Sequence, residues 1–291
     1  MPHLSTVQKD AFWRDGYLMI DDAIDDRQLA ALRDQFARWV EESRAHAAPY
    51  GRMLDGRPRF DVQPGHSREK PALRRVASPT ELSDDYLAVL TRSRLVDVVA
   101  ELIGPDVRFH HGKINSKLPG SGTEVKWHQD FAYTPHTNDD IITALTFVDE
   151  VTAENGPLQV VAGSHRGPIQ SLWQDGVFTG TVEPALVADL VAKSAFCLGR
   201  AGAACLMHTR LLHASEANRS SRPRTLFICD FAAADAIALS PNPLPSRHAG
   251  MIVRGTEPGR VRAISYEMEL PEYPKGASFF EQQAKHKDTV Q

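Results

Sequence analysis

The stretch Lys126-Trp127-His128-Gln129-Asp130-Phe131 places an imidazole and a carboxylate two residues apart. In an extended segment both side chains point to the same face. Such a strand edge supplies two of the three protein ligands of a 2-His-1-carboxylate iron site, in which the other positions of an octahedral Fe(II) stay open. Alone the pair is weak evidence, because roughly 1.5 matches of this kind are expected by chance. A second match, His286-Lys287-Asp288, stands near the end of the chain.

The third ligand of such a site is expected to be a histidine well downstream. Two candidates, His208 and His213, lie five residues apart. In one strand they would face opposite ways, so only one of them can join the site. Arg224 follows His213 by eleven residues. Its planar guanidinium matches the two oxygens of a carboxylate, which suits a carboxylate co-substrate.

The composition is that of a globular protein, with 42% hydrophobic and 24% charged residues among 291 and a formal net charge of -4. This mild charge argues against bulk nucleic-acid binding. Three scattered cysteines, Cys197, Cys205 and Cys229, favour a reducing compartment without a disulfide framework. No stretch approaches the roughly 18 apolar residues of a membrane span. We therefore expect a cytoplasmic protein of one domain.

Helices are predicted in the first part of the chain. They are expected over 5–15, ended by Gly16 in a left-handed turn, from about 25 to 40, and over 95–103. Between 47 and 79 the pattern predicts loops with one strand near 59–62. Functionally the helical opening is interpreted as packing only, because a hydrophobic stripe at this period is usually core.

After these predicted helices, the sequence pattern changes to short β-type runs separated by turns. This pattern predicts a sandwich or jelly roll and not a βαβ sheet. No P-loop or G-x-G-x-x-G sequence is present, so neither a nucleotide nor an NAD site is supported. The predicted strands are 107–118, 141–148, 158–161, 203–207 and 225–232. We expect one domain over 1–291, with N-terminal helices over about 5–104, a core over about 105–270 and a polar tail over 277–291.

Three sequence motifs in the same order and spacing resemble the phytanoyl-CoA dioxygenase family of Fe(II)- and 2-oxoglutarate-dependent oxygenases. They are His128-x-Asp130, Asn155-Gly-Pro-Leu158 leading to Gly163-Ser-His165, and Leu211-Leu-His213-Ala-Ser215 with Asn218 and Arg224. The resemblance covers most of the chain, from Phe12 to Ala234. It implies a mainly β fold with flanking helices, whose core is a cupin-like double-stranded β-helix.

The resemblance also implies roles for individual residues. His128, Asp130 and His213 would hold iron. The distal carboxylate of 2-oxoglutarate would be gripped by Arg224, with Ser215 and Asn115 helping to place it. Two positions depart from the family pattern: Gly202-Ala203 replaces a frequent Gly-Asp in a structural turn, and Leu145 stands where the phytanoyl-CoA enzyme carries a tryptophan, which weakens the transfer of its substrate.

The aromatic residues that flank the ligands, Trp127, Phe131 and Tyr133, are interpreted either as walls of a substrate pocket or as packing. His208 is interpreted as structural, with orientation of a group next to the ligands as the functional option. The remaining histidines of this region are assigned no metal: His110, His111, His136 and His165.

The implied reaction is the oxidation of an unactivated C–H bond, with 2-oxoglutarate and O2 consumed and succinate and CO2 released. Asp130 favours hydroxylation, because related halogenases lose this carboxylate to make room for chloride. Two alternatives remain: a zinc hydrolase built on the same ligands, and a non-catalytic jelly-roll binding protein. Arg224 and the absence of an obvious general base argue against the hydrolase, and the intact ligand set argues against the binding protein.

The substrate is left open by the sequence. The loops expected to line its pocket, near 47–79, 131–140, 166–198 and 236–258, mix Arg, His, Pro and aromatic residues without a signature. A CoA thioester, an amino acid, a phosphonate and a secondary metabolite are all compatible. The basic cluster of Arg68, Lys70, Arg74 and Arg75 is interpreted as a solvated face, with contact to an anionic substrate as the functional alternative.

Overall fold

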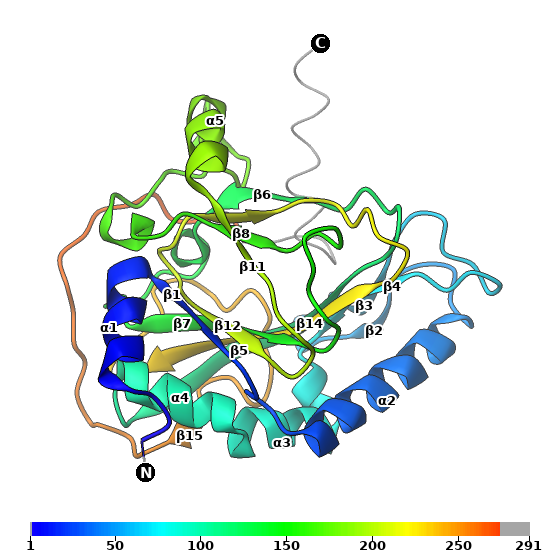
Figure 1. Ribbon diagram of the computed structural model, residues 1–291, viewed down its shortest axis with the longest axis horizontal. Coiled ribbons are helices and arrows are strands. Elements are labelled where there is room, and N and C mark those ends of the chain that lie inside the picture. The colour runs from blue at the N-terminus through cyan, green and yellow to red at the C-terminus, as the bar shows by residue number, and fades with distance from the viewer. Residues whose placement is uncertain (1, 274–291) are drawn as a thin grey trace.

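The computed structural model describes residues 2–273 of the protein. Its centre is a pair of β-sheets that face each other, with helices packed on the outer side of the larger one (Figure 1). The expected mainly β fold with a jelly-roll core is confirmed. The predicted polar tail over 277–291 and the second pair, His286-Lys287-Asp288, lie outside the described residues.

The larger sheet has nine strands in the described part of the chain, in the order β1-β12-β7-β14-β5-β4-β3-β2 with β15 also paired to β5. The smaller sheet has the order β11-β8-β13-β6. The strands of the larger sheet are β1 (Tyr17–Ile20), β2 (Tyr50–Arg52), β3 (Pro58–Val62), β4 (Leu73–Ala77), β5 (Val107–Lys117), β7 (Ile141–Phe147), β12 (Ala204–His208), β14 (Arg224–Ala233) and β15 (Ile252–Arg254). The smaller sheet contains β6 (Val125–His128), β8 (Leu158–Val160), β11 (Ala195–Cys197) and β13 (His213–Ser215), and a separate hairpin pairs β9 (Trp173–Gln174) with β10 (Val177–Phe178).

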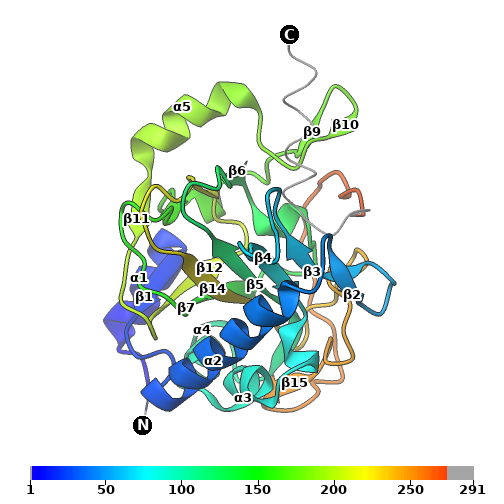
Figure 2. The same cartoon turned by 90° about the vertical axis from the view of Figure 1, so that its right-hand side faces the viewer.

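Three helices cover the outer face of the larger sheet, and a fourth lies beyond the smaller sheet on the opposite side of the molecule (Figure 2). The covering helices are α2 (Asp26–Ser43), α3 (Asp84–Arg92) and α4 (Arg94–Ile103); α5 (Pro184–Lys193) lies beyond the smaller sheet, and α1 (Thr6–Asp15) precedes β1. Short 3-10 turns complete the fold: η1 (Pro79–Glu81), η2 (Asp130–Ala132) and η3 (Ser164–Arg166).

Strand β14 is buried along its whole length and serves two cores. Phe227 and Phe231 point to the helical side, whereas Leu226 and Ile228 join the core between the two sheets. This alternation follows from the two-residue period of a strand. The same inward face of β14 also carries polar groups, so the space between the sheets is part core and part cavity.

The helical starts were predictable because their caps are local. The Ser5 side chain accepts a hydrogen bond from the backbone N–H of Gln8, and the Gln8 side chain accepts one from the backbone N–H of Ser5. Gly16 ends α1 with a φ of 81°. Asp25 caps α2 in the same reciprocal way. The segment from 47 to 79 was mispredicted, because it contains three strands, β2, β3 and β4, where one was expected.

The cysteines are all buried and free. The Sγ atoms of Cys197 and Cys205 lie 3.6 Å apart across neighbouring segments of the core. Among the helices of residues 2–273, none combines the length and the apolar character that crossing a membrane requires.

Candidate active site

Two histidines and one carboxylate meet at the edge of the smaller sheet. His128 ends β6 and is paired with His213, which begins β13. Asp130 follows two residues after His128 and opens the 3-10 turn η2. Its Oδ1 lies 3.3 Å from Nε2 of His128 and 3.6 Å from Nε2 of His213. The side chains selected by the H-x-D spacing and one downstream histidine thus converge within 4.8 Å of one another.

Both histidines are oriented by a hydrogen bond at Nδ1. Nδ1 of His128 lies 2.7 Å from the carbonyl of Lys126, and Nδ1 of His213 lies 2.9 Å from the carbonyl of Leu211. Both carbonyls are acceptors, so the protons sit on Nδ1 and the Nε2 lone pairs face Asp130. Such partners fix the tautomer and the orientation of metal-binding histidines. Two imidazoles and one carboxylate on one side of an open space fit an iron ion of the facial-triad type.

The protonation states suit a cation. Burial and the neighbouring His213 lower the pKa of His128, which keeps its imidazole neutral. Burial alone would raise the pKa of Asp130, but the two histidines outweigh it and hold that pKa well below its usual range. A neutral imidazole and an ionised carboxylate are the forms that bind metals.

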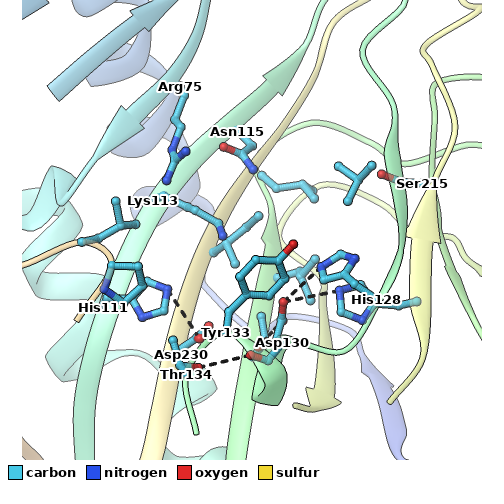
Figure 3. Close-up of a pocket in the computed structure, with 18 of the residues that line it drawn as sticks. Arg75, His111, Lys113, Asn115, His128, Asp130, Tyr133, Thr134, Ser215 and Asp230 are labelled. Carbon is cyan, nitrogen blue, oxygen red and sulfur yellow. Dashed lines mark hydrogen bonds and ion pairs between the residues drawn. The ribbon is translucent and has the colours of Figure 1, made fainter. Parts of the chain in front are cut away.

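The cluster opens into a cavity between the two sheets, and Figure 3 shows the side chains that point into it. We call His128, Asp130 and His213 the metal-type cluster. This cluster and Ser215 come from the smaller-sheet side, whereas Arg75, Lys113 and Asn115 come from the larger sheet. From His111 to Lys117 the odd-numbered residues of β5 face the cavity, as the strand period requires, and Ser116 also reaches its edge. The lining residues of β5 and β14 are His111, Lys113, Asn115, Ser116, Lys117, Arg224, Leu226, Ile228 and Asp230.

One end of the cavity is built for an anion. Arg224 is buried, donates 2.8 Å from one terminal nitrogen to the carbonyl of Gly156, and leaves its Nε without a hydrogen-bond partner in the described structure. Lys117, opposite Arg224 in the sheet, donates to the backbone and hydroxyl oxygens of Ser215, the latter at 2.7 Å. Oδ1 of Asn115 is likewise buried and unsatisfied within the described residues. Arg224, Ser215 and Asn115, the three residues expected to bind 2-oxoglutarate, therefore line the same cavity as the metal-type cluster.

The electrostatics of this end favour the binding of an anion. Burial lowers the pKa of Arg224 to about 10. Burial and the nearby Arg224 also hold the pKa of Lys117 well below its usual value. Two neighbouring buried cations are costly unless an anion compensates them. An anionic ligand at this end would provide that compensation.

A second cluster lies beside the first. Nε2 of His111 is 3.5 Å from Oδ2 of Asp230, and the Nδ1 atoms of His110 and His111 are 2.8 Å apart. Burial, with the neighbouring Asp130, raises the pKa of Asp230 to about 7. Burial lowers the pKa of His110 to about 3, so this histidine stays neutral. These groups border the cavity next to Thr143, which is paired with Asp230 across β7 and β14.

The other predicted residues are distributed differently. Tyr133 lines the cavity, whereas Trp127 and Phe131 do not and pack instead into two separate apolar clusters. Trp127 precedes His128 on β6, so strand alternation turns it away from the cavity that His128 faces, whereas Phe131 lies in the 3-10 turn that begins at Asp130. His208 stays outside the cavity, with its ring near those of Trp13 and His165.

The prediction that His208 and His213 share one strand is wrong. They do not face opposite ways on one strand; they belong to β12 and β13, which lie in different sheets and are joined by a turn. Sequence reasoning also missed Lys113, Lys117 and Thr143. For the two lysines a signal existed, because they flank Asn115 at the two-residue period of a strand that was predicted.

Comparison with known proteins supports the same assignment. The family model for phytanoyl-CoA dioxygenase (PhyH) matches residues 12–226. A probable alpha-ketoglutarate-dependent hypophosphite dioxygenase from Stutzerimonas stutzeri is 32% identical over 206 residues, which is 69% of this chain and 71% of the relative. L-proline trans-4-hydroxylase from Streptomyces griseoviridis is 25% identical over 241 residues, covering 76% of this chain and 83% of the relative. The crystal structure of EctD from S. alaskensis with 2-oxoglutarate and 5-hydroxyectoine matches with a TM-score of 0.63 at 22% identity, covering 92% of this chain and 88% of that one.

Fold, site chemistry and relatives together define a dioxygenase that depends on Fe(II) and 2-oxoglutarate. The chain belongs to the phytanoyl-CoA dioxygenase family. The expected family, enzyme class and cofactors, namely iron, 2-oxoglutarate and O2, are confirmed.

Proposed function

We propose that the protein hydroxylates, or otherwise oxidises, an unactivated C–H bond of a small molecule, with His128, Asp130 and His213 as the iron ligands. When bound, iron and 2-oxoglutarate supply the oxidising power: one oxygen atom of O2 enters the substrate, the other enters succinate, and CO2 is released. The observation that carries the proposal is the placement of this ligand set and the buried Arg224 in one cavity.

The chain itself contributes position and charge. Arg224, with its Nε turned to no acceptor among the described residues, would take the distal carboxylate of 2-oxoglutarate. Ser215 and Asn115 would help to place the co-substrate, and Lys117 would hold Ser215 in position. Retention of Asp130 favours hydroxylation over halogenation. The named relatives act on substrates as different as hypophosphite and L-proline, which supports a small substrate without selecting one.

Two finer assignments remain proposals of the same kind. We place the protein in the cytoplasm on the basis of its three free thiols. We also treat residues 1–291 as one domain, on the basis that the large sheet contains strands from both early and late parts of the chain.

The test is anaerobic binding of Fe(II) and 2-oxoglutarate, followed by visible charge-transfer absorption. The parent protein should develop the band, Asp130→Ala should lose it through loss of metal, and Arg224→Ala should need far more 2-oxoglutarate to reach it. Metal analysis separates the alternatives, because a zinc hydrolase would retain zinc and show no 2-oxoglutarate affinity. Absence of the band in the metal-replete parent would refute the assigned ligands.

A further inference from the structure

Two cations from the larger sheet face the metal-type cluster across the cavity. Arg75 lies on β4 and Lys113 on β5, and both line the cavity (Figure 3). Arg75 is opposite Asn115, and Lys113 is opposite Ala77, so the two cations are diagonal neighbours on adjacent antiparallel strands. Diagonal neighbours lie roughly 7–8 Å apart at the backbone, a spacing that long side chains easily bridge. They form one positively charged wall.

Lys113 is the informative member of the pair. Its ammonium makes no hydrogen bond or ion pair with any residue in 2–273, although its Cα lies at the centre of the sheet. Lys117, which is the second inward-facing residue after Lys113 on β5, donates to oxygens of Ser215 and Glu216. A partly buried ammonium without a partner is unfavourable unless a ligand supplies the missing charge. Burial and the nearby Arg75 accordingly lower the pKa of Lys113.

The co-substrate leaves Lys113 uncompensated. Along β5 the inward residues run His111, Lys113, Asn115, Lys117, and successive members are roughly 7 Å apart. Lys117 is paired with Arg224 at the end proposed for 2-oxoglutarate, whereas His111 is paired with Asp230 beside the metal-type cluster. Lys113 therefore stands between the co-substrate end and the metal-type cluster, within reach of a second ligand.

Asp230 and Asp130 do not neutralise the ammonium of Lys113 by contact. Asp230 is turned to His111, at 3.5 Å, and Asp130 faces the two histidines. No ion pair joins either of them to Lys113 within the described residues. Glu272 also lines the cavity, from the segment that follows the last strand.

We propose that the substrate carries an oxyanion group, a carboxylate, phosphate or phosphonate, and that Lys113 and Arg75 bind this group directly. The proposal rests on the proposed function, because it assigns the far end of the same cavity to 2-oxoglutarate. On β5, Lys113 is the next inward-facing residue after His111, which lies at the edge of the metal-type cluster. The C–H bond that is oxidised then lies only a few atoms from the anionic group of the substrate. The ammonium supplies a point charge and the guanidinium a planar fork for two oxygens.

The test uses the full-length Fe(II) protein, saturated with 2-oxoglutarate under anaerobic conditions, so that the co-substrate end is already filled. Propionate, phosphate and ethylphosphonate are titrated, with propionamide and diethyl ethylphosphonate as neutral counterparts. Perturbation of the charge-transfer band gives each Kd. At least one anion should bind ten-fold more tightly than its neutral counterpart, and the best of the three identifies the oxyanion.

Variants then assign the binding to the wall. Lys113→Met and Arg75→Gln should each weaken the anion ten-fold or more, Lys113→Arg should restore most of the affinity, and the affinity for 2-oxoglutarate should stay within two-fold of the parent. Lys193→Met, at an exposed lysine of α5 outside the cavity lining, is the matched control and should change nothing.

Failure of this inference is distinct from failure of the proposed function. A parent without the band would remove the proposed function itself. A normal band that no anion perturbs, or anion affinity that survives in Lys113→Met, would overturn the anionic substrate. Loss of 2-oxoglutarate affinity in Lys113→Met would assign the ammonium to the co-substrate, and would overturn it as well.

Discussion

The hydroxyl of Thr143 donates a 2.7 Å hydrogen bond to Oδ2 of Asp130. Thr143 belongs to β7 of the larger sheet, whereas both histidines of the cluster belong to the smaller one. The bond therefore connects the two sheets at the metal-type cluster and leaves Oδ1 of Asp130 facing the histidines.

Thr143→Val should weaken Fe(II) binding about ten-fold, because partners that orient a metal ligand typically contribute 10–100-fold to affinity. The measurement is Fe(II) titration under anaerobic conditions. Thr146→Val is the matched control: Thr146 is buried on the same strand, and its hydroxyl has no hydrogen-bond partner in the described residues, so its removal should leave affinity unchanged. Equal effects of the two substitutions would mean that the loss reflects general packing and not orientation of Asp130.

Lys117→Met should raise the Kd for 2-oxoglutarate about ten-fold, since a hydrogen bond to a charged group contributes roughly 1.5–3 kcal/mol. The substitution removes both a cation beside Arg224 and the contact that holds Ser215. Titration of the charge-transfer band measures the effect, and metal affinity should be retained. Lys193→Met, at an exposed lysine of α5, provides the control. An unchanged Kd would exclude Lys117 from the co-substrate end.

Gly156→Ala should lower both the melting temperature and the affinity for 2-oxoglutarate. Gly156 has a φ of +76°, and an added Cβ would lie 2.5 Å from the carbonyl of Glu216 and 3.1 Å from the Lys117 side chain. Its own carbonyl accepts the hydrogen bond from Arg224. Gly120→Ala has a similar φ of +65° and meets nothing within 4 Å, so it isolates the backbone strain of roughly 1–2 kcal/mol. Comparable losses in both variants would contradict a steric role at Gly156.

Acidification should destabilise the fold between pH 6.5 and about 4. Burial lowers the pKa of His136 from 6.5 to about 4, so below pH 6.5 the unfolded chain binds a proton that the folded chain refuses. The stabilising contribution is thus fully present above pH 6.5 and is lost as the pH falls, by about 1.4 kcal/mol per pH unit for one histidine. Urea unfolding at several pH values measures this slope.

His136→Asn keeps a donor for the carbonyl of Thr134, which Nδ1 of His136 contacts at 2.8 Å, and should reduce that slope. An identical slope in His136→Asn and the parent would show that this imidazole does not govern the acid response.

The sequence predicted those helices and strands whose signal lies within a few neighbouring residues. The capped starts of α1 and α2 rest on residues three apart, and the long strands β5, β7 and β14 carry continuous β-type patterns, so all of these were found. Strands β2 to β4 were underpredicted because charged residues occupy buried positions there. Arg59, for example, is buried by its contacts with Glu81 and with backbone carbonyls of the next segment, which no local pattern reveals.

The candidate site was predictable in its ligand types and less so in its walls. His128 and Asp130 are separated by one residue, but their convergence with His213 depends on the pairing of β6 with β13. Lys113 and Lys117 become meaningful only once β5 is known to face a cavity, because an inward lysine on a sheet is otherwise unexpected. For Trp127 and Phe131 the sequence left pocket wall and packing open, and the structure packs them into two apolar clusters.

The walls of the cavity differ in how freely they can change. Its floor is formed by β5 and β14, whose opposite faces carry the packing against α2–α4, so a substitution there disturbs fold and chemistry together. Its remaining rim comes from connecting segments that contain Ser240, Pro241, Pro243, Leu244 and Pro271. Surface connections tolerate replacement far better than sheet residues do. Exchange of these rim segments between related enzymes should therefore alter selectivity for the substrate while the shared oxidising machinery survives, which makes them the natural place to engineer or to evolve a new specificity.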